Sequence, residues 1–354
     1  MKNVMKRILA LSVTVITSVS ASVFAVGCSN IVKSMPVKNI VLMIGDGMGK
    51  NHLKATADYY QEELYIETLC YAEGEVTTYS ANSEVTDSAA AATALSCGVK
   101  TDNGMVAKNK DGDLMNMTEY MHSVGKRVGI VVTESVLGAT PAGFSAHCDN
   151  RNNLYEILCS QIDVGAEVMI GYDDSLSMDK NQITAGGYEF ALQLDILKTT
   201  SSSKAFIGLE GYKAYGDEND YPTLGDAADA AFDFLNKDND GGFFMMVEAS
   251  HIDKYSHSND IFGMMKQLKQ FDIAVKRMVD KAVADGDTLV IVTADHETGD
   301  LRYTGSEEIA NSLYKSTSHT GQNVKYFIYG KQGVKLKGVI DNTDICKLIR
   351  QCAE

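Results

Sequence analysis

The chain has 354 residues, a formal net charge of −15, 45% hydrophobic residues and only three prolines. This hydrophobic content is enough for a sizeable core, and an acidic balance argues against nucleic acids or anionic membranes as partners. Because the sequence has no Pro/Ser-rich linker, internal repeat or low-complexity tract, one compact domain over residues 37–354 is favoured over two joined domains.

Residues 1–27 have the pattern of a secretory signal peptide, in which basic residues precede an apolar stretch that runs to about Val26. The tripeptide Val23-Phe24-Ala25 suits ordinary cleavage. Alternatively, Ala25-Val26-Gly27-Cys28 resembles a bacterial lipoprotein box, with Cys28 as the lipidated first residue. We therefore expect an exported protein, periplasmic or at the cell surface, with a lipid anchor at Cys28 slightly favoured. Residues 28–36 would be a short tether, and the mature charge would be −18 because three basic residues are removed.

Short apolar runs predict seven strands, near residues 39–44, 128–133, 167–170, 205–209, 243–248, 288–294 and 324–329. Apolar side chains at helical spacing predict a helix over residues 260–284, ended by Asp285-Gly286. This alternation predicts an α/β fold, a three-layer α/β/α sandwich around a mostly parallel central sheet. Residues 171–240 are more polar and irregular, and we expect them to form a lid or an excursion beside the site.

The most informative stretch is Thr86-Asp87-Ser88 followed by four alanines. Asp and Ser side chains satisfy backbone N–H groups in a first helical turn, and alanine is the best helix former. Ser88 is therefore expected at a helix N-terminus, where free N–H groups and the dipole favour an anion. A hydroxyl that faces a phosphate-sized site is a candidate nucleophile, and the alternative is a plain capped helix.

Carboxylates and histidines follow three of the predicted strands, and one more histidine precedes the last strand. In open α/β sheets, ligands bind outside the carboxyl ends of the strands, so these side chains could form one site. They are Asp46, Glu248, Asp253, His257, Asp295, His296 and His319.

Taken together, these motifs resemble the alkaline phosphatase family, in the family's order, from about Val37 to the C-terminus. The matching segments are Gly45-Asp46-Gly47-Met48-Gly49, Asp87-Ser88-Ala89-Ala90, Gly98-Val99-Lys100-Thr101, Ala139-Thr140-Pro141-Ala142, Arg151, Glu248 through His257, Thr293-Ala294-Asp295-His296 and His319-Thr320-Gly321. Family members often carry a bulky crown-type insertion before the last histidine. Here only residues 297–318 separate the motifs, so the insertion is expected to be absent or minimal.

The resemblance implies two zinc ions and a serine nucleophile at Ser88. The first zinc would activate the water and stabilise the leaving alkoxide, and its implied ligands are Asp253, His257 and His319. The second zinc would lower the pKa of Ser88, and its implied ligands are Asp46, Asp295 and His296.

The resemblance also implies a phosphate-binding arginine and a third ion, magnesium. Arg151 would bind two phosphate oxygens with its planar fork. The magnesium would use Asp46, Thr140 and Glu248, whose oxygen atoms suit a hard cation. The sequence departs from the family pattern at Gly138, where Asp or His is usual, so the third ion is expected to be weakly bound or different.

The function implied is that of an exported phosphomonoesterase that hydrolyses small-molecule phosphate monoesters through a phosphoserine, with a homodimer left open. The alternatives are a phosphodiesterase or another hydrolase of the same superfamily, and a non-enzymatic metal-binding surface lipoprotein. The Cys/Ser-x-Pro-x-Arg motif of sulfatases is absent. Arg151 favours a dianionic monoester.

Several reactive side chains match no motif of the implied site. Histidines at 52, 122, 147 and 251 are expected to be structural or on the surface, as is Lys100. Six cysteines follow Cys28, and both disulfides and buried free thiols are compatible with an exported protein. They are Cys70, Cys97, Cys148, Cys159, Cys346 and Cys352.

Overall fold

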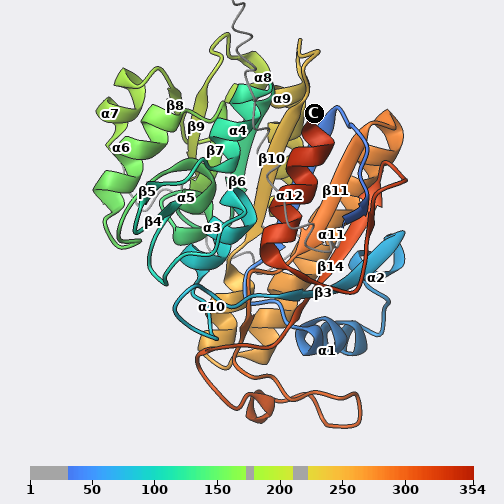
Figure 1. Cartoon of the computed structure of the whole chain (residues 1–354). Coiled ribbons are helices and arrows are strands. Elements are labelled where there is room, and N and C mark those ends of the chain that lie inside the picture. The colour runs from blue at the N-terminus through green and yellow to red at the C-terminus, as the bar shows by residue number, and fades with distance from the viewer. Residues whose placement is uncertain (1–30, 173–178, 210–221) are drawn as a thin grey trace, which may run out of the picture.

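The structure is a computed structural model, and it describes residues 31–172, 179–209 and 222–354. A ten-stranded sheet runs through the centre of the molecule (Figure 1). From edge to edge, its strands are β16 (Val339–Asp341), β3 (Ala72–Thr77), β14 (Val324–Gly330), β11 (Thr288–Thr293), β2 (Asn39–Gly45), β10 (Phe243–Ala249), β6 (Arg127–Val132), β7 (Val168–Tyr172), β9 (Ala205–Leu209) and β8 (Glu189–Ala191). Among these described strands, β14 is antiparallel to both neighbours and the other adjacent pairs are parallel, which confirms a mostly parallel sheet.

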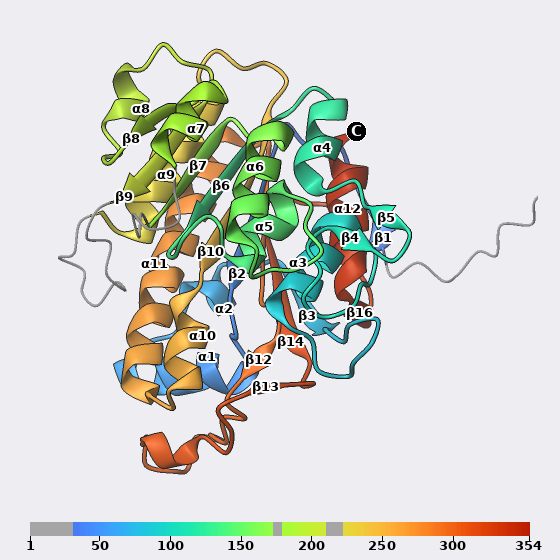
Figure 2. The same cartoon turned by 90° about the vertical axis from the view of Figure 1, so that its left-hand side faces the viewer.

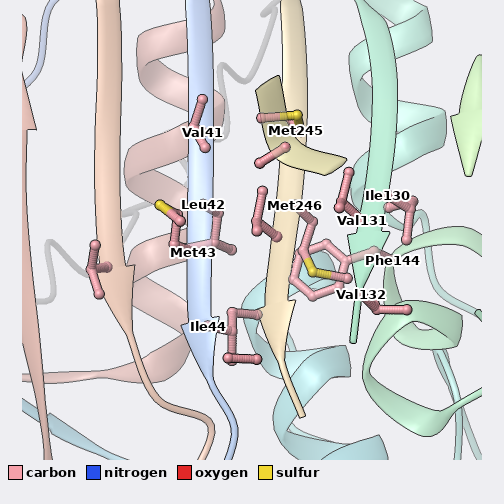
Figure 3. Packing of buried hydrophobic residues seen from close by; sticks show 14 of the residues in the cluster. Val41, Leu42, Met43, Ile44, Ile130, Val131, Val132, Phe144, Met245 and Met246 are labelled. Atoms are coloured by element: carbon pink, nitrogen blue, oxygen red, sulfur yellow. The ribbon is translucent and has the colours of Figure 1, made fainter. Parts of the chain in front are cut away.

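The central strands β2 and β10 are buried along their whole length. Helices cover both faces of a parallel sheet, so its strands need apolar side chains on both sides, and the predicted apolar runs supply them. Figure 3 shows these side chains in contact across β2, β10 and β6. Phe144, from a helix above the sheet, stacks on Phe244 with ring centroids 6.1 Å apart.

Two helical layers enclose the sheet (Figure 2), which confirms the predicted sandwich. One layer contains α1 (Lys50–Tyr60), α2 (Tyr65–Thr68), α9 (Leu224–Asn236), α10 (His251–His257) and α11 (Ile261–Asp285). The other contains α3 (Ser88–Cys97), α4 (Met117–Ser123), α5 (Ala139–Ser145), α6 (Leu154–Val164) and α12 (Asn342–Ala353). Two short helices lie near the β8 edge, α7 (Lys180–Ala185) beside β8 and α8 (Ile196–Thr199) beside α9.

Helix α11 confirms the predicted long helix and its end. The Asp260 side chain accepts a hydrogen bond from the Gly263 N–H at the start, and Gly286 ends the helix with a φ of 70°. Such caps satisfy backbone groups that the helix itself leaves without partners. The buried methionines on this helix fill the core, as their spacing predicts.

Helix α3 begins at Ser88, as the alanine-rich stretch predicts. The Asp87 side chain caps it by accepting from the Ala90 N–H at 2.9 Å. The alanines allow α3 to lie very close to α5, because a Cβ atom at Gly143 would approach Ala92 Cβ to 2.6 Å. Small residues on both helices therefore set the position of the helix that carries Ser88.

The expectation for residues 171–240 is wrong for the part of it that the structure describes. This segment builds one edge of the main sheet through β8 and β9 and adds three helices. The strand predicted at 205–209 is β9, whereas β8 has only three residues and gives a weak apolar signal. Residues 173–178 and 210–221 lie outside the described residues, as does the expected signal segment.

Small elements complete the chain. Before the last histidine there is only the short strand β12 (Glu297–Thr298) and one 3-10 turn (Asn311–Leu313), so the large insertion is absent there. Strand β12 pairs with β13 (His319–Thr320), and β4 (Lys108–Asn109) with β5 (Gly112–Asp113). Strand β1 (Ile31–Lys33), within the expected tether, pairs with β15 (Lys335–Leu336).

All six cysteines in the described part of the chain have free thiols. Cys346 and Cys352 lie on the same helix, α12, where disulfide geometry is unfavourable. No helix among the described residues has both the length and the apolar character needed to cross a membrane.

Candidate active site

The register of the sheet brings the carboxyl ends of its central strands to one level. Glu248 on β10 pairs with Ile44 on β2 and with Val132 on β6, and Thr293 on β11 also pairs with Ile44. The residues that follow these strands therefore leave the sheet together. The expected ligands converge at this edge, as the rule for open α/β sheets predicts.

Ser88 is the first residue of α3 and is 6% exposed. Its Oγ lies 3.3 Å from Nε2 of His296. The free N–H groups and the dipole of α3 favour negative charge at this end of the helix. The structure thus places the predicted nucleophile beside one of the predicted ligands, at an end of a helix that suits an anion.

The first predicted ligand group, Asp253, His257 and His319, is brought together by the structure. Asp253 and His257 lie one turn apart on α10, and the β12–β13 pairing places His319 opposite them. His257 Nε2 lies 3.1 Å from His319 Nε2 and 3.2 Å from Asp253 Oδ2. Ligand atoms of the three residues lie within 4.8 Å of one another, which suits one metal ion.

The Nε2 atoms of the two histidines in this group face each other, and this geometry favours a positive charge between them. His257 Nδ1 lies 2.6 Å from the carbonyl oxygen of Thr317, and His319 Nδ1 lies 3.0 Å from that of Thr86. Because carbonyls only accept, we assign the ring protons to Nδ1, and each Nε2 then carries a lone pair. Two lone pairs at 3.1 Å would repel each other, so a metal ion held by both atoms would stabilise this geometry.

A second group lies next to Ser88 and shares Asp253 with the first. Ligand atoms of Asp46, Asp253 and His296 lie within 4.8 Å of one another. Asp295, predicted for this group, is adjacent, with Oδ2 3.1 Å from His296 Nε2. Its other oxygen accepts from the Gly47 N–H at 3.1 Å.

The two groups are held together by Thr298. Its hydroxyl donates to Asp253 and lies 3.2 Å from His296 Nδ1. Burial would raise the pKa of Asp253, but hydrogen bonding with His257 and Thr298 and the charge of His296 keep it well below its usual range. Burial and the charge of His296 lower the pKa of His319 to about 4.

A third set of oxygen atoms is buried without hydrogen-bond partners. It includes Asp46 Oδ1, Thr140 Oγ1 and both Glu248 carboxylate oxygens. Burial, followed by the charges of Glu134 and Asp295, raises the pKa of Glu248 to about 8. The nearby hydroxyls of Ser250 and Thr140 lower this pKa in part, although neither makes a hydrogen bond of ordinary geometry with the Glu248 carboxylate. Burial and nearby acids also raise the pKa of Asp46 well above its usual value. Such oxygens suit a hard cation such as Mg²⁺.

Arg151 contacts Asp87, the residue that precedes Ser88. Its Nη1 donates to Asp87 Oδ2 at 3.1 Å, and about a third of its side chain is exposed. The guanidinium is therefore fixed beside the residue that precedes the nucleophile.

The four histidines that match no motif have other partners. His52 lies 3.1 Å from Ser256 Oγ, and His251 lies 3.2 Å from Thr133 Oγ1. Those at 122 and 147 pair with glutamates. Lys100 donates to Tyr79 and Asn342 near the start of α12, away from the ligand groups.

Glu134 and Thr298 are the site residues that the sequence analysis missed. Glu134 directly follows the predicted strand at 128–133, so the rule that ligands follow strand ends could have found it. Thr298 lies two residues after His296, but a lone threonine gives no signal in the sequence.

The α/β sandwich, together with a serine beside two groups of carboxylates and histidines, is typical of the alkaline phosphatase class of hydrolases. The family model described as alkaline phosphatase matches residues 37–193 and 193–312. The chain therefore belongs to the alkaline phosphatase family.

Two relatives from Bacillus subtilis (strain 168) show the extent of the similarity. Alkaline phosphatase 3 is 37% identical over 285 residues, which cover 74% of this chain and 62% of the relative, so the chain spans less than two thirds of that protein. Alkaline phosphatase 4 is 30% identical over 407 aligned positions, with 88% of each chain covered.

Among solved structures, the alkaline phosphatase from the Antarctic bacterium TAB5 is 28% identical, with a TM-score of 0.79. The match covers 90% of this chain and 99% of that one. A histidine-to-aspartate mutant of the TAB5 enzyme has been solved with Mg bound in the M3 site.

Proposed function

We propose that the protein is a metal-dependent phosphomonoesterase that releases inorganic phosphate from small phosphate monoesters. The observation that carries this proposal is the position of Ser88 Oγ, 3.3 Å from His296 Nε2 at the N-terminus of α3. The candidate nucleophile, a helix N-terminus that favours anions and two groups of candidate metal ligands meet at that point. Family membership supports the same class of reaction.

Two zinc ions fit the two ligand groups, because carboxylate oxygens and histidine Nε2 atoms are ligands that zinc accepts. Asp253, His257 and His319 would hold the first ion. Asp46 and His296 of the second group, with the adjacent Asp295, would hold the second. When bound, the ions would offset the charge of the phosphate and stabilise the attacking and leaving oxygens.

The chain's own residues then position the reaction. Arg151 and the first N–H groups of α3 hold the phosphate oxygens so that phosphorus faces Ser88 Oγ. The Oγ–P bond forms while the ester P–O bond breaks, the serine proton passes to solvent, and the alcohol leaves after taking a proton from water. Water then attacks phosphorus, breaks the Ser88 phosphoester and restores the hydroxyl.

A third ion, magnesium, fits the oxygen atoms of Asp46, Thr140 and Glu248, which lack other partners. It would keep Glu248 and Asp46 ionised and hold Asp46 in place for the second group. The Mg-bound TAB5 mutant supports this choice of ion.

The test is metal content and turnover on two substrates. The full chain is stripped with a chelator, reloaded with zinc and magnesium, and assayed with 4-nitrophenyl phosphate and bis(4-nitrophenyl) phosphate. We expect metal-dependent turnover that is far faster on the monoester. Faster turnover of the diester would support the phosphodiesterase alternative, and a metal-loaded protein inactive on both would support the binding protein.

We also propose that the protein is exported and carries a lipid on Cys28, on the basis of its N-terminal sequence. Labelled palmitate should enter the wild-type protein in a bacterial host. The Cys28→Ala variant should remain unlabelled. Equal labelling of both, or of neither, would contradict the anchor.

A further inference from the structure

The space that a side chain at position 138 would occupy is filled by another residue. A Cβ atom at Gly138 would lie 2.3 Å from Oε1 of Glu134. The φ of Gly138 is −57°, which any amino acid can adopt, so its backbone does not require glycine. The carboxylate of Glu134 thus stands at the place where the sequence has lost the usual Asp or His.

We propose that Glu134 supplies the anionic oxygen that Gly138 cannot, and that it belongs to the third cation site with Asp46, Thr140 and Glu248. This proposal rests on the proposed function and names one more residue of its magnesium site. It reverses the expectation from the sequence that this site is weak.

The main chain fixes Glu134 at the edge of the sheet. The Tyr172 N–H donates to the Glu134 carbonyl at 2.8 Å. The preceding residue, Thr133, donates its N–H to the Glu248 carbonyl at 3.1 Å, and its hydroxyl accepts from the Ser250 N–H at 2.8 Å. Main-chain hydrogen bonds therefore hold the start of the segment after β6, which carries Glu134, beside the end of β10 where Glu248 lies.

Two buried residues of the proposed cation site have oxygen atoms without partners. Glu248 is 0% exposed and Thr140 is 1% exposed, and the carboxylate and hydroxyl oxygens of both lack hydrogen-bond partners. An ionised carboxylate that is buried without a partner is costly, so a positive charge at this place would stabilise Glu248.

Lys254 supplies part of that charge in the metal-free protein. Its Nζ forms an ion pair with Oε2 of Glu134. The lysine side chain is 48% exposed and long enough to move to solvent, whereas the Glu134 backbone is fixed. A bound cation would therefore compete with Lys254 for the same carboxylate.

The alternative is that Glu134 only neutralises Lys254. Substitution of Glu134 alone and together with Lys254 distinguishes these two roles. The full chain is loaded with zinc and titrated with Mn²⁺, a magnesium substitute whose free form is counted by electron paramagnetic resonance. Glu134→Gln should weaken Mn²⁺ binding by about 10- to 100-fold.

The double variant Glu134→Gln with Lys254→Met separates the readings. If Glu134 provides an oxygen to the cation site, the double variant stays weak because the carboxylate is still missing. Recovery of wild-type affinity in the double variant would overturn the proposal, since only the balance of charge would then matter. Unchanged affinity in Glu134→Gln alone would overturn it as well.

A transfer of the carboxylate gives an independent test. Gly138→Asp in the Glu134→Ala background should bind Mn²⁺ more tightly than Glu134→Ala alone, because the shorter side chain leaves the shared space to the new carboxylate. Gly138→Asp alone should not tighten binding, since its Cβ would meet Glu134. Zinc content and monoester turnover are measured on the same samples. If the wild-type protein neither holds zinc nor turns over the monoester, the proposed function is wrong. If its zinc content and turnover are normal but Glu134→Gln binds Mn²⁺ as tightly as the wild type, only this inference is wrong.

Discussion

Asp87 joins Arg151 to the helix that carries Ser88. One of its carboxylate oxygens accepts from Arg151 Nη1 at 3.1 Å, and the other accepts from the Ala90 N–H at 2.9 Å. A single side chain therefore sets both the start of α3 and the direction of the arginine. The arginine, about a third of whose side chain is exposed, is thereby held near the start of α3, where the nearly buried Ser88 lies.

Replacement of Arg151 should weaken phosphate binding more than it disturbs the fold. Arg151→Ala removes charge-assisted hydrogen bonds to phosphate, so the inhibition constant of inorganic phosphate should rise roughly 10- to 100-fold. Arg151→Lys should lie between, because lysine has no planar fork. The matched control is Arg302→Ala, which removes an exposed arginine paired with Asp300. Equal phosphate inhibition in all four proteins would exclude Arg151 from the binding site.

Removal of a zinc ligand should lower metal content, activity and stability together. We expect His319→Ala and Asp295→Ala to lose zinc and most turnover, and to melt at a lower temperature, because metal binding adds to the free energy of unfolding. His122→Ala is the control, since that histidine pairs with Glu167 outside the site. Full zinc occupancy in both ligand variants would show that the ligand sets are wrong.

Much of this architecture is predictable because its signals are local. The seven predicted strands are mostly apolar runs, and all of them are present in the sheet. Helix α11 has apolar spacing, an N-cap and a terminal glycine, so its limits could be predicted closely. Asp253 and His257 are four residues apart, and α10 places them on one face as that spacing implies.

The remainder depends on contacts between distant parts of the chain. The structure shows Asp253 between the two ligand groups, and it shows Thr298 in contact with both. The sequence at Gly138 indicates a lost ligand, because the residue whose carboxylate fills that space, Glu134, lies four residues earlier. Only the three-dimensional packing can reveal such an exchange of position.

The metal-free protein should lose stability as the pH rises past the usual range of glutamate. In the folded state the pKa of Glu248 is raised to about 8, against 4.5 for a free side chain. Between these values the folded form keeps a proton that the unfolded chain has lost, so the free energy of unfolding falls as the pH rises. Glu248→Gln cannot ionise and should lack this contribution.

Urea denaturation of the two metal-free proteins at pH 5 and pH 8.5 measures the effect. The glutamine variant should gain in stability relative to the wild type at the higher pH, because other titrating groups cancel in the comparison. Magnesium should stabilise the wild type more than the variant at pH 8.5. A difference between the proteins that is independent of pH would contradict the assignment of the raised pKa to Glu248.

Ser88→Ala should lower monoester turnover by several orders of magnitude and leave metal content nearly unchanged. Covalent catalysis is lost, but metal-assisted attack by water remains, so a small residual activity is expected. Turnover at the wild-type level would exclude Ser88 as the nucleophile.

The most direct measurement is the trapping of the phosphoenzyme itself. The zinc-loaded protein is mixed with a phosphate monoester, quenched in acid within milliseconds and digested for mass spectrometry. We predict one phosphate group on the peptide that contains Ser88, and none on that peptide in Ser88→Ala. Rapid hydrolysis of the substrate with phosphate on another residue, or with none trapped on the protein, would contradict it.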